Sequence, residues 1–272
     1  MIESMLEPLV SSRFLKEEKY RTGHIKVINP VEGRRIIGVH VPEMKTLARK
    51  LALSETEALR MLSEFRACYD KDPFSLLYEE TVVWGLVIDY LKVSWEIRAG
   101  LLRDFVPVLD NWGVCDTFCS NAKWVNDKAA LWDFLSPYWA SDREFEVRFA
   151  VVMSMTSLLD EQYFPLICRK FESLDMSRIK SNYNPASVSG YVSVDGYNTV
   201  NGYVTARGYG TVKGDSPHYV NMAIAWFLAT SLAKFPEQTR SYVNMSSLPD
   251  NIIRLYVRKA RESFRTRDVS PL

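Results

Sequence analysis

Apolar residues recur at helical spacing through most of the first two thirds of the chain, between about residues 42 and 174. Glycine is rare in this stretch, and Pro, Asp, Ser or Asn interrupts the apolar pattern roughly every 15 to 20 residues. Each segment is apolar on one side only and needs a neighbour against which to bury that side. The pattern therefore predicts an all-α solenoid of stacked helix pairs with a concave side, although no strict sequence period accompanies it.

Start and stop signals support several of these helices. Pro42-Glu43 opens the first one, and the segment that begins at Ser54 resembles a capping box for the second. Pro236 stands just beyond the end of a later apolar segment. The predicted helices cover residues 42–51, 54–65, 75–92, 95–109, 116–124, 128–140, 143–159, 163–174, 219–234 and 249–264.

Residues 190–214 break the helical pattern with a regular six-residue repeat, in which glycine begins each unit and tyrosine follows it. Each unit joins residues of high strand propensity to an x-Gly step, and Asn201-Gly202 is a strong signal for a type I′ turn. We expect a β-hairpin that turns there and places Val200 opposite Tyr203. A short meander and a flexible Gly-rich loop without a role are the alternatives.

Length and composition are those of a folded protein, with 272 residues of which 47% are hydrophobic and 25% charged. One compact body or two small domains fit this length, and we expect a single α-helical repeat domain over residues 1–272 with an insertion at 184–216. Lys and Arg number 34 against 33 Asp and Glu, so the formal charge is +1 and no long-range field attracts a polyanion. A nucleic-acid partner must therefore meet a local basic patch.

The chain lacks a run of about 18 apolar residues and its first residues are acidic, so we expect neither a membrane span nor a secretion signal. Four cysteines without a C-x-x-C pair fit a reducing compartment, and we expect a cytoplasmic protein. The three histidines stand apart from the cysteines in the sequence. We therefore expect no metal site and no cofactor.

Four arginines share one stripe along the last predicted helix, at spacing i, i+4, i+7 and i+11. They are Arg254, Arg258, Arg261 and Arg265. Guanidinium groups arranged in this way bind phosphates bidentately. A solvated charged face explains this feature equally well.

The segment LDNWGVCDTFC, residues 109–119, places a tryptophan four residues before a carboxylate. Trp112 and Asp116 can lie one turn apart on the same helical face. An aromatic ring beside an anion favours a cationic, planar ligand. The alternative is that Asp116 caps a helix that begins at Thr117 and that Trp112 is a core residue.

Two further residues stand out in apolar helices. Arg148 is the charged residue of VRFAVVMSM, and an arginine in such a helix usually reaches a partner at the surface or in a cleft. Trp226 stands among small residues in MAIAWFLAT, where it either fills the core or projects into a groove.

These segments together resemble the AlkD-type DNA alkylation repair proteins, bacterial DNA glycosylase-like proteins built of HEAT-like helical repeats. The resemblance covers most of the chain in family order and leaves out the N-terminal region and the insertion. The motifs that carry it are IIGVHVPEMKTLARKLA (36–52), YEETVVWGLVIDYL (78–91), DNWGVCDTFC (110–119), VRFAVVMSM (147–155), YVNMAIAWFLAT (219–230) and RKARESFR (258–265).

The resemblance implies a role for each candidate residue. Asp116 resembles the catalytic carboxylate, Trp112 and Trp226 resemble aromatic residues that line the lesion pocket, and Arg148 resembles an arginine that holds phosphate. The expected partner is double-stranded DNA in the concave groove of a monomer, without a membrane. The expected reaction is excision of purines that carry positive charge after alkylation at N3 or N7, because a fixed carboxylate stabilises the sugar cation that forms.

Two departures from the family pattern leave other functions open. His40 stands in GVHVP where the family usually has arginine, and the insertion presents four residues suited to DNA contacts. These are Tyr203, Arg207, Tyr209 and Lys213. Some relatives with a β-hairpin in the groove are thought to bind branched or distorted DNA without excising bases. A non-catalytic DNA-structure-binding protein and a protein-binding scaffold are therefore the alternatives to a glycosylase.

Overall fold

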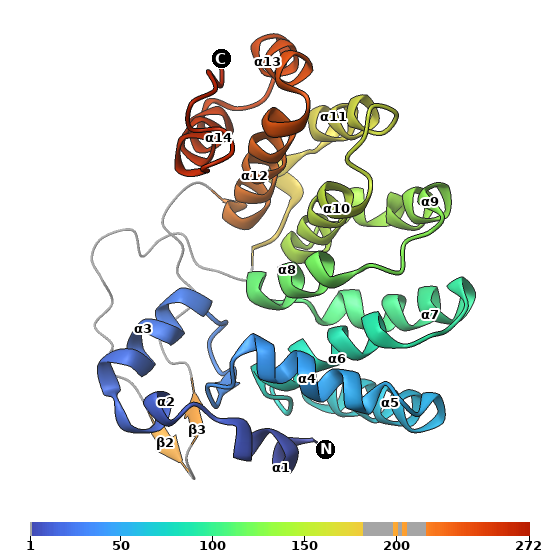
Figure 1. Cartoon of the computed structure of the whole chain (residues 1–272), viewed down its shortest axis with the longest axis vertical. Coiled ribbons are helices and arrows are strands. Elements are labelled where there is room, and N and C mark those ends of the chain that lie inside the picture. Colours follow the sequence, from blue (N-terminus) through green and yellow to red (C-terminus); the bar gives the residue numbers. More distant parts are fainter. Residues whose placement is uncertain (1, 182–197, 201–202, 206–215) are drawn as a thin grey trace. The chain divides into compact units, whose positions relative to one another are not determined.

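The structure, a computed structural model, describes residues 2–181, 198–200, 203–205 and 216–272 (Figure 1). The chain divides into two compact units. Unit 1 comprises residues 1–124 and 182–211, and unit 2 comprises residues 125–181 and 212–272. A single repeat domain over residues 1–272 stays a prediction.

Unit 1 is built around α6, which packs against α4 and α8 as well as α5 and α7. Because α6 is apolar on nearly every side, it is buried from Tyr78 to Asp89. The helices of this unit are α1 (Glu3–Leu6), α2 (Ser12–Lys16), α3 (Glu18–Ile28), α4 (Val41–Leu51), α5 (Glu55–Lys71), α6 (Tyr78–Tyr90), α7 (Trp95–Phe105) and α8 (Trp112–Asn121), with 3-10 turns η1 (Glu7–Leu9) and η2 (Val106–Val108).

A small antiparallel sheet joins the insertion to the N-terminal part of unit 1. Its strands are β1 (Arg35–Ile36), β2 (Asn198–Val200) and β3 (Tyr203–Thr205), in the order β1-β3-β2. Val200 pairs with Tyr203 across β2 and β3, which confirms the expected hairpin register around residues 201–202. The pairing of β3 with β1 was not predicted, because it connects segments about 170 residues apart.

Unit 2 has the same helix-on-helix construction. α12 packs against α10, α13 and α14, and it is buried along most of its length. The elements are α9 (Lys128–Trp139), α10 (Glu144–Ser157), α11 (Phe164–Ser173), η3 (Met176–Arg178), α12 (His218–Lys234), α13 (Pro236–Met245) and α14 (Asp250–Glu262).

Helices two apart in the sequence pack against each other in both units, as α4, α6 and α8 do in unit 1 and α10, α12 and α14 in unit 2. This is the contact pattern of helical repeats, in which each helix pair stacks on the next. The prediction of an all-α helical-repeat fold is confirmed. The helices α1, α2, α3 and α13 were not predicted, and α1 and α2 span only four and five residues.

Several predicted boundaries are wrong. The helix predicted over residues 54–65 extends to Lys71 in α5, and two further differences concern candidate residues. α8 begins at Trp112 and not at Asp116, because Asn111 has an extended backbone and its side chain accepts the N–H of Gly113 at 2.7 Å. Asp116 therefore lies inside the helix and does not cap it. α14 ends at Glu262, so Arg265 lies beyond the helix that carries the other three arginines.

Candidate functional site

α8 places Trp112 and Asp116 one turn apart on one face of the helix. Both side chains are half-buried, whereas Cys115, Phe118 and Cys119 on the same helix are buried. The indole Nε1 of Trp112 donates a hydrogen bond to the carbonyl of Val27 at 3.1 Å, which fixes the plane of the ring. The aromatic ring and the carboxylate predicted to act together therefore lie on the partly exposed side of α8.

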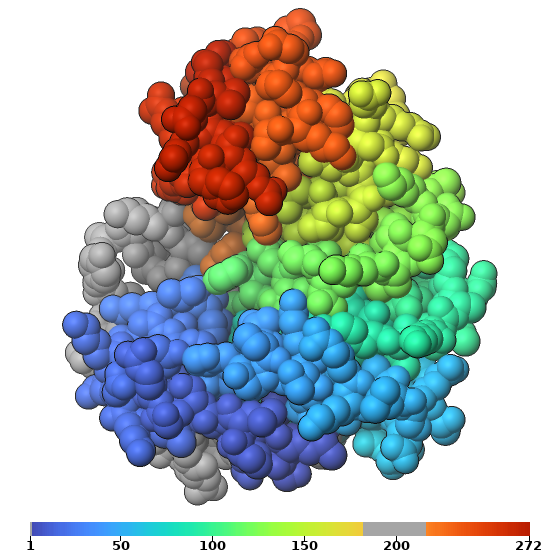
Figure 2. All heavy atoms as spheres, viewed as in Figure 1, coloured from blue at the N-terminus to red at the C-terminus, as the bar shows by residue number. Residues whose placement is uncertain are grey.

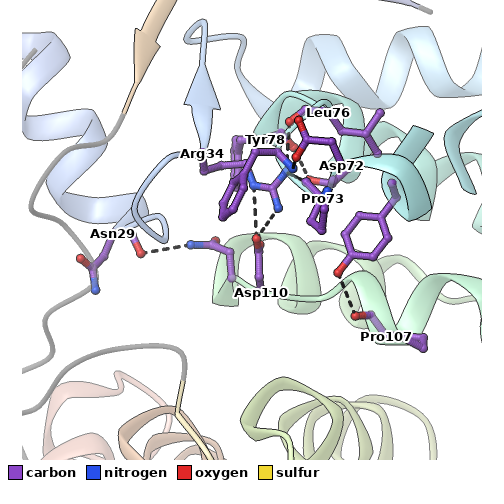
Figure 3. Close-up of polar contacts among 12 residues, drawn as sticks. Asn29, Arg34, Asp72, Pro73, Leu76, Tyr78, Pro107 and Asp110 are labelled. Carbon is purple, nitrogen blue, oxygen red and sulfur yellow. Dashed lines mark hydrogen bonds and ion pairs between the residues drawn. The ribbon is translucent and has the colours of Figure 1, made fainter. Parts of the chain in front are cut away.

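The start of α8 is held by Asn111, which is only 1% exposed. Its Oδ1 accepts the N–H of Gly113, and its Nδ2 donates to the carbonyls of Ile28 at 2.8 Å and Asn29 at 3.3 Å. Figure 3 labels Asn29, whose carbonyl accepts one of these hydrogen bonds. One amide thus caps α8 and contacts the end of α3.

An ion pair between the buried Arg34 and the partly exposed Asp110 precedes Asn111. The guanidinium of Arg34, 2% exposed, donates to the Oδ2 of Asp110 through Nε at 3.2 Å and through Nη2 at 2.5 Å (Figure 3). Its Nη1 donates to the carbonyls of Pro73 at 2.7 Å and Leu76 at 3.0 Å. Arg34 thereby ties Asp110 to the loop that precedes α6.

Tyr78 of α6 lies against the first turn of α8. A Cβ atom added at Gly113 would stand 2.4 Å from the hydroxyl oxygen of Tyr78, so only glycine allows this approach. Burial raises the pKa of Tyr78, and the carboxylates of Glu79, Asp110 and Asp116 raise it further. The phenol therefore stays protonated and presents a neutral hydroxyl beside the start of α8.

These supporting residues were predicted only in part. The motif that contains Asp110 and Asn111 was recognised, but the partners of these two side chains were missed. Nothing in the sequence around Arg34 or Tyr78 indicates that these residues support the start of α8. Their contacts with Asp110 and Gly113 arise from the fold.

In unit 2, Arg148 is buried at 3% exposure on α10. Its Nη1 donates to the carbonyl of Tyr219 at 2.6 Å, and the guanidinium carbon lies 5.8 Å from the centre of the Tyr219 ring. The Oε1 of Glu144 accepts the backbone N–H of Tyr219 at 2.6 Å. Arg148 and Glu144 thus hold the first turn of α12, the helix on which Trp226 lies half-buried. A phosphate contact by Arg148 stays a prediction.

Two guanidinium groups lie near His218 at the start of α12. Burial lowers the pKa of His218, and the nearby guanidinium groups of Arg148 and Arg258 lower it further. Arg258 belongs to α14, whose atoms lie at the surface of unit 2 in Figure 2. The predicted phosphate-binding arginines Arg254, Arg258, Arg261 and Arg265 are all exposed.

The remaining sequence candidates belong to the insertion or precede α4 in the sequence. Tyr203 belongs to β3, whereas Arg207, Tyr209 and Lys213 lie outside the described residues. His40 precedes α4, and its Nε2 lies 2.9 Å from the hydroxyl of Tyr20. Any contact of these residues with DNA stays a prediction.

The four residues of the proposed site form two pairs. Trp112 and Asp116 share α8 of unit 1, and Arg148 and Trp226 belong to the packed helices α10 and α12 of unit 2. That the two pairs act on one ligand stays a prediction.

Two pockets lie in the described part of unit 2, and none of the candidate site residues lines either of them. One has a volume of about 650 Å³ and lies between α11 and α13, with Phe164, Phe235 and Tyr242 in its lining. The other, of about 200 Å³, lies between the ends of α9 and α11. Both pockets are therefore separate from the candidate site.

The described part of the chain contains neither a cluster of three or more His, Cys, Asp or Glu side chains placed to hold a metal ion nor a helix long and apolar enough to cross a bilayer.

A family model described as DNA alkylation repair enzyme matches residues 10–174, more than half of the chain. This range includes Trp112, Asp116 and Arg148, whereas Trp226 and the arginines of α14 lie beyond it. No curated protein and no solved structure matches the chain.

Proposed function

The chain belongs to the family of DNA alkylation repair enzymes, and on that premise we propose that it is a DNA glycosylase that removes positively charged N3- or N7-alkylated purines from duplex DNA. The observation that carries this proposal is the pairing of Trp112 and Asp116 on the partly exposed side of α8. Both residues lie within the range that matches the family.

The reaction follows from the charge of the substrate. A purine alkylated at N3 or N7 is cationic, so its bond to C1′ of the deoxyribose breaks readily, and the bonding electrons neutralise the departing base. Positive charge then develops on the sugar. The carboxylate of Asp116 stabilises this charge and orients a water molecule, which adds to C1′ and releases a proton.

The aromatic and cationic residues supply binding. The ring of Trp112, held by its hydrogen bond to Val27, offers a face to the cationic base or sugar. We assign Trp226 the same kind of contact from unit 2. The exposed Arg254, Arg258 and Arg261 are assigned to the phosphate backbone, since guanidinium groups bind phosphate oxygens bidentately. Arg148, at 3% exposure, is assigned to holding the first turn of α12 through the carbonyl of Tyr219.

The test is release of N7-methylguanine and N3-methyladenine from methylated duplex DNA under single-turnover conditions. Asp116→Asn keeps the shape of the side chain but removes its charge, so we expect the rate constant to fall about 10²- to 10³-fold, as when one stabilising group is removed from an active site. Asp104→Asn on α7 is the matched control, because it removes an exposed carboxylate from the same unit and should leave the rate unchanged.

Other outcomes identify the alternatives. Intact DNA binding without base release by the wild-type protein would favour a DNA-structure-binding protein. Absence of salt-dependent DNA binding would favour a protein-binding scaffold. Equal rates for the wild type and Asp116→Asn would exclude Asp116 as the catalytic carboxylate.

A further inference from the structure

We infer that Asn111 and Arg34 are positioning residues that orient the Trp112–Asp116 pair by fastening the start of α8 to residues 27–34. This inference rests on the proposed function, since it assigns these residues an effect on the rate of base release. Neither residue is expected to touch DNA, because Asn111 is 1% exposed and Arg34 is 2% exposed.

Three consecutive side chains make the connection. Trp112 donates to the carbonyl of Val27, Asn111 donates to the carbonyls of Ile28 and Asn29, and Asp110 accepts from Arg34. We call this set of contacts the α8 clamp. It joins residues 27–34 to residues 110–112 across more than seventy residues of sequence.

The clamp uses groups that the helix ends leave without intrahelical partners. The last carbonyls of a helix have no N–H of their own helix to bind, and Val27, Ile28 and Asn29 stand at the end of α3. The N–H groups in the first turn of α8 likewise need an acceptor, which the Oδ1 of Asn111 supplies to Gly113. The Asn111 amide therefore serves two helix ends at once.

Asparagine is the side chain that fits this double task. Aspartate and serine cap helix starts as well as asparagine does, but neither offers an NH₂ group that donates to two carbonyls. A buried amide without its acceptors, or buried carbonyls without their donor, would destabilise the fold. A substitution at position 111 can therefore change the orientation of α8 while the helix still forms.

Arg34 holds the other side of the clamp. Its guanidinium binds Asp110 and the carbonyls of Pro73 and Leu76, so the residue before Asn111 is tied to the loop that leads into α6. α6 also packs directly against α8. A buried arginine with several fixed acceptors has little freedom to move, which makes the start of α8 rigid.

Rigidity at this point bears on catalysis because Asp116 lies one turn beyond Trp112. A displacement of a catalytic group by about 1 Å can reduce a rate about 100-fold. The indole of Trp112 is itself part of the clamp, so any loosening moves both members of the pair. The clamp therefore determines where the carboxylate and the ring point.

The first test compares Asn111→Ser and Asn111→Asp with the wild type. Both variants keep a capping residue at the start of α8 and lack the amide donors. We expect the single-turnover rate constant of base release to fall at least 10-fold, while the affinity for undamaged duplex DNA changes less than twofold. Ser94→Asp at the start of α7 is the matched control, because this exchange of capping residues touches no second helix end, and it should leave the rate unchanged.

The second test needs no DNA and measures how well the α8 clamp protects the indole N–H of Trp112 from solvent exchange. The indole N–H of Trp112, identified in a ¹H–¹⁵N spectrum by its disappearance in Trp112→Phe, should exchange with solvent at least 10-fold faster in Asn111→Ser than in the wild type. Arg34→Met should also accelerate this exchange, and Arg34→Lys should restore only part of the protection, because lysine lacks the fixed pair of N–H donors that Arg34 directs at the Oδ2 of Asp110.

The two tests separate this inference from the proposed function. If the wild type releases no base but the indole exchanges faster in the Asn111 variants, the glycosylase proposal fails and the α8 clamp stands. If indole exchange is unchanged, or if rate and DNA affinity fall together with the melting temperature, Asn111 is a purely structural residue and the positioning role is overturned.

Discussion

A single buried carboxylate organises the loop before α4. Glu79 has no exposed surface, and its Oε1 accepts the backbone N–H of Gly38 at 2.7 Å and lies within 3.2–3.4 Å of the N–H groups of Ile37 and Val39. Burial raises its pKa to about 7, while these hydrogen bonds act in the opposite direction. The side chain of Glu79 on α6 therefore determines the backbone path of residues 37–39.

Gly38 is the point of this loop that tolerates no side chain. Its φ is +84°, and an added Cβ would stand 2.1 Å from the Phe14 ring. We expect Gly38→Ala to lower the free energy of unfolding by about 3 kcal/mol, because backbone strain and overpacking add. Urea unfolding measures this change.

Gly23 provides the control for this substitution. It is exposed within α3, and nothing lies within 4 Å of an added Cβ. Gly23→Ala should therefore raise the free energy of unfolding by about 0.5–1 kcal/mol, since alanine favours a helix over glycine. A similar destabilisation of both variants would contradict the explanation given for Gly38.

At the scale of elements, α6 and α8 are joined at their C-terminal ends by Asp89. This carboxylate is 8% exposed and accepts hydrogen bonds from Trp124 Nε1 at 2.7 Å and Asn121 Nδ2 at 3.2 Å. Burial raises the pKa of Asp89 to about 8, although these bonds and the charges of Arg98 and Lys45 lower it. The packing of α6 against α8 thus includes a group that titrates near neutral pH.

This pKa predicts a dependence of stability on pH. The unfolded carboxyl group titrates near 4, so between about pH 4 and 8 the folded state binds the proton more tightly. The stability that Asp89 contributes is complete below pH 4 and is lost as the pH rises toward 8. Asp89→Asn cannot titrate and should gain stability relative to the wild type over that interval.

Melting temperatures measured from pH 4 to 8 test this prediction. Asp133→Asn, which alters an exposed carboxylate on α9, serves as the control and should parallel the wild type. A constant difference between Asp89→Asn and the wild type across the interval would show that Asp89 has no raised pKa.

Helix prediction from the sequence succeeded where the apolar pattern was strong. The prediction for 128–140 agrees closely with α9, and that for 219–234 differs from α12 by one residue at its start. The prediction of the start of α8 failed, because Asn111 and Asp116 are both good capping residues. Only the tertiary contacts of Asn111 with the end of α3 make Asn111 the residue that caps the helix.

At the scale of the whole molecule, the near-neutral net charge requires a local surface for DNA. Arg254, Arg258 and Arg261 are exposed on α14, and we expect their replacement by glutamine to weaken binding to duplex DNA. The slope of log Kd against log salt concentration should decrease by about 0.9 for each phosphate that the variant no longer neutralises, or by about 2 to 3 in the triple variant.

Three other arginines supply a control of equal charge. Arg13, Arg60 and Arg267 are exposed and each pairs with a nearby carboxylate. Their replacement by glutamine should leave the salt slope within about 0.5 of the wild-type value. Equal changes in the two triple variants would mean that α14 has no special part in DNA binding.

The sequence by itself determined the fold class, most of the helices and the hairpin register, because these depend on local spacing and turn residues that the chain displays directly. It also identified Trp112 and Asp116 as a pair, since four residues make one helical turn. Only the tertiary structure decided which residues support them. Arg34, Tyr78 and the carbonyls at the end of α3 reach α8 through packing between distant segments, and such contacts leave no periodic signal in a single sequence.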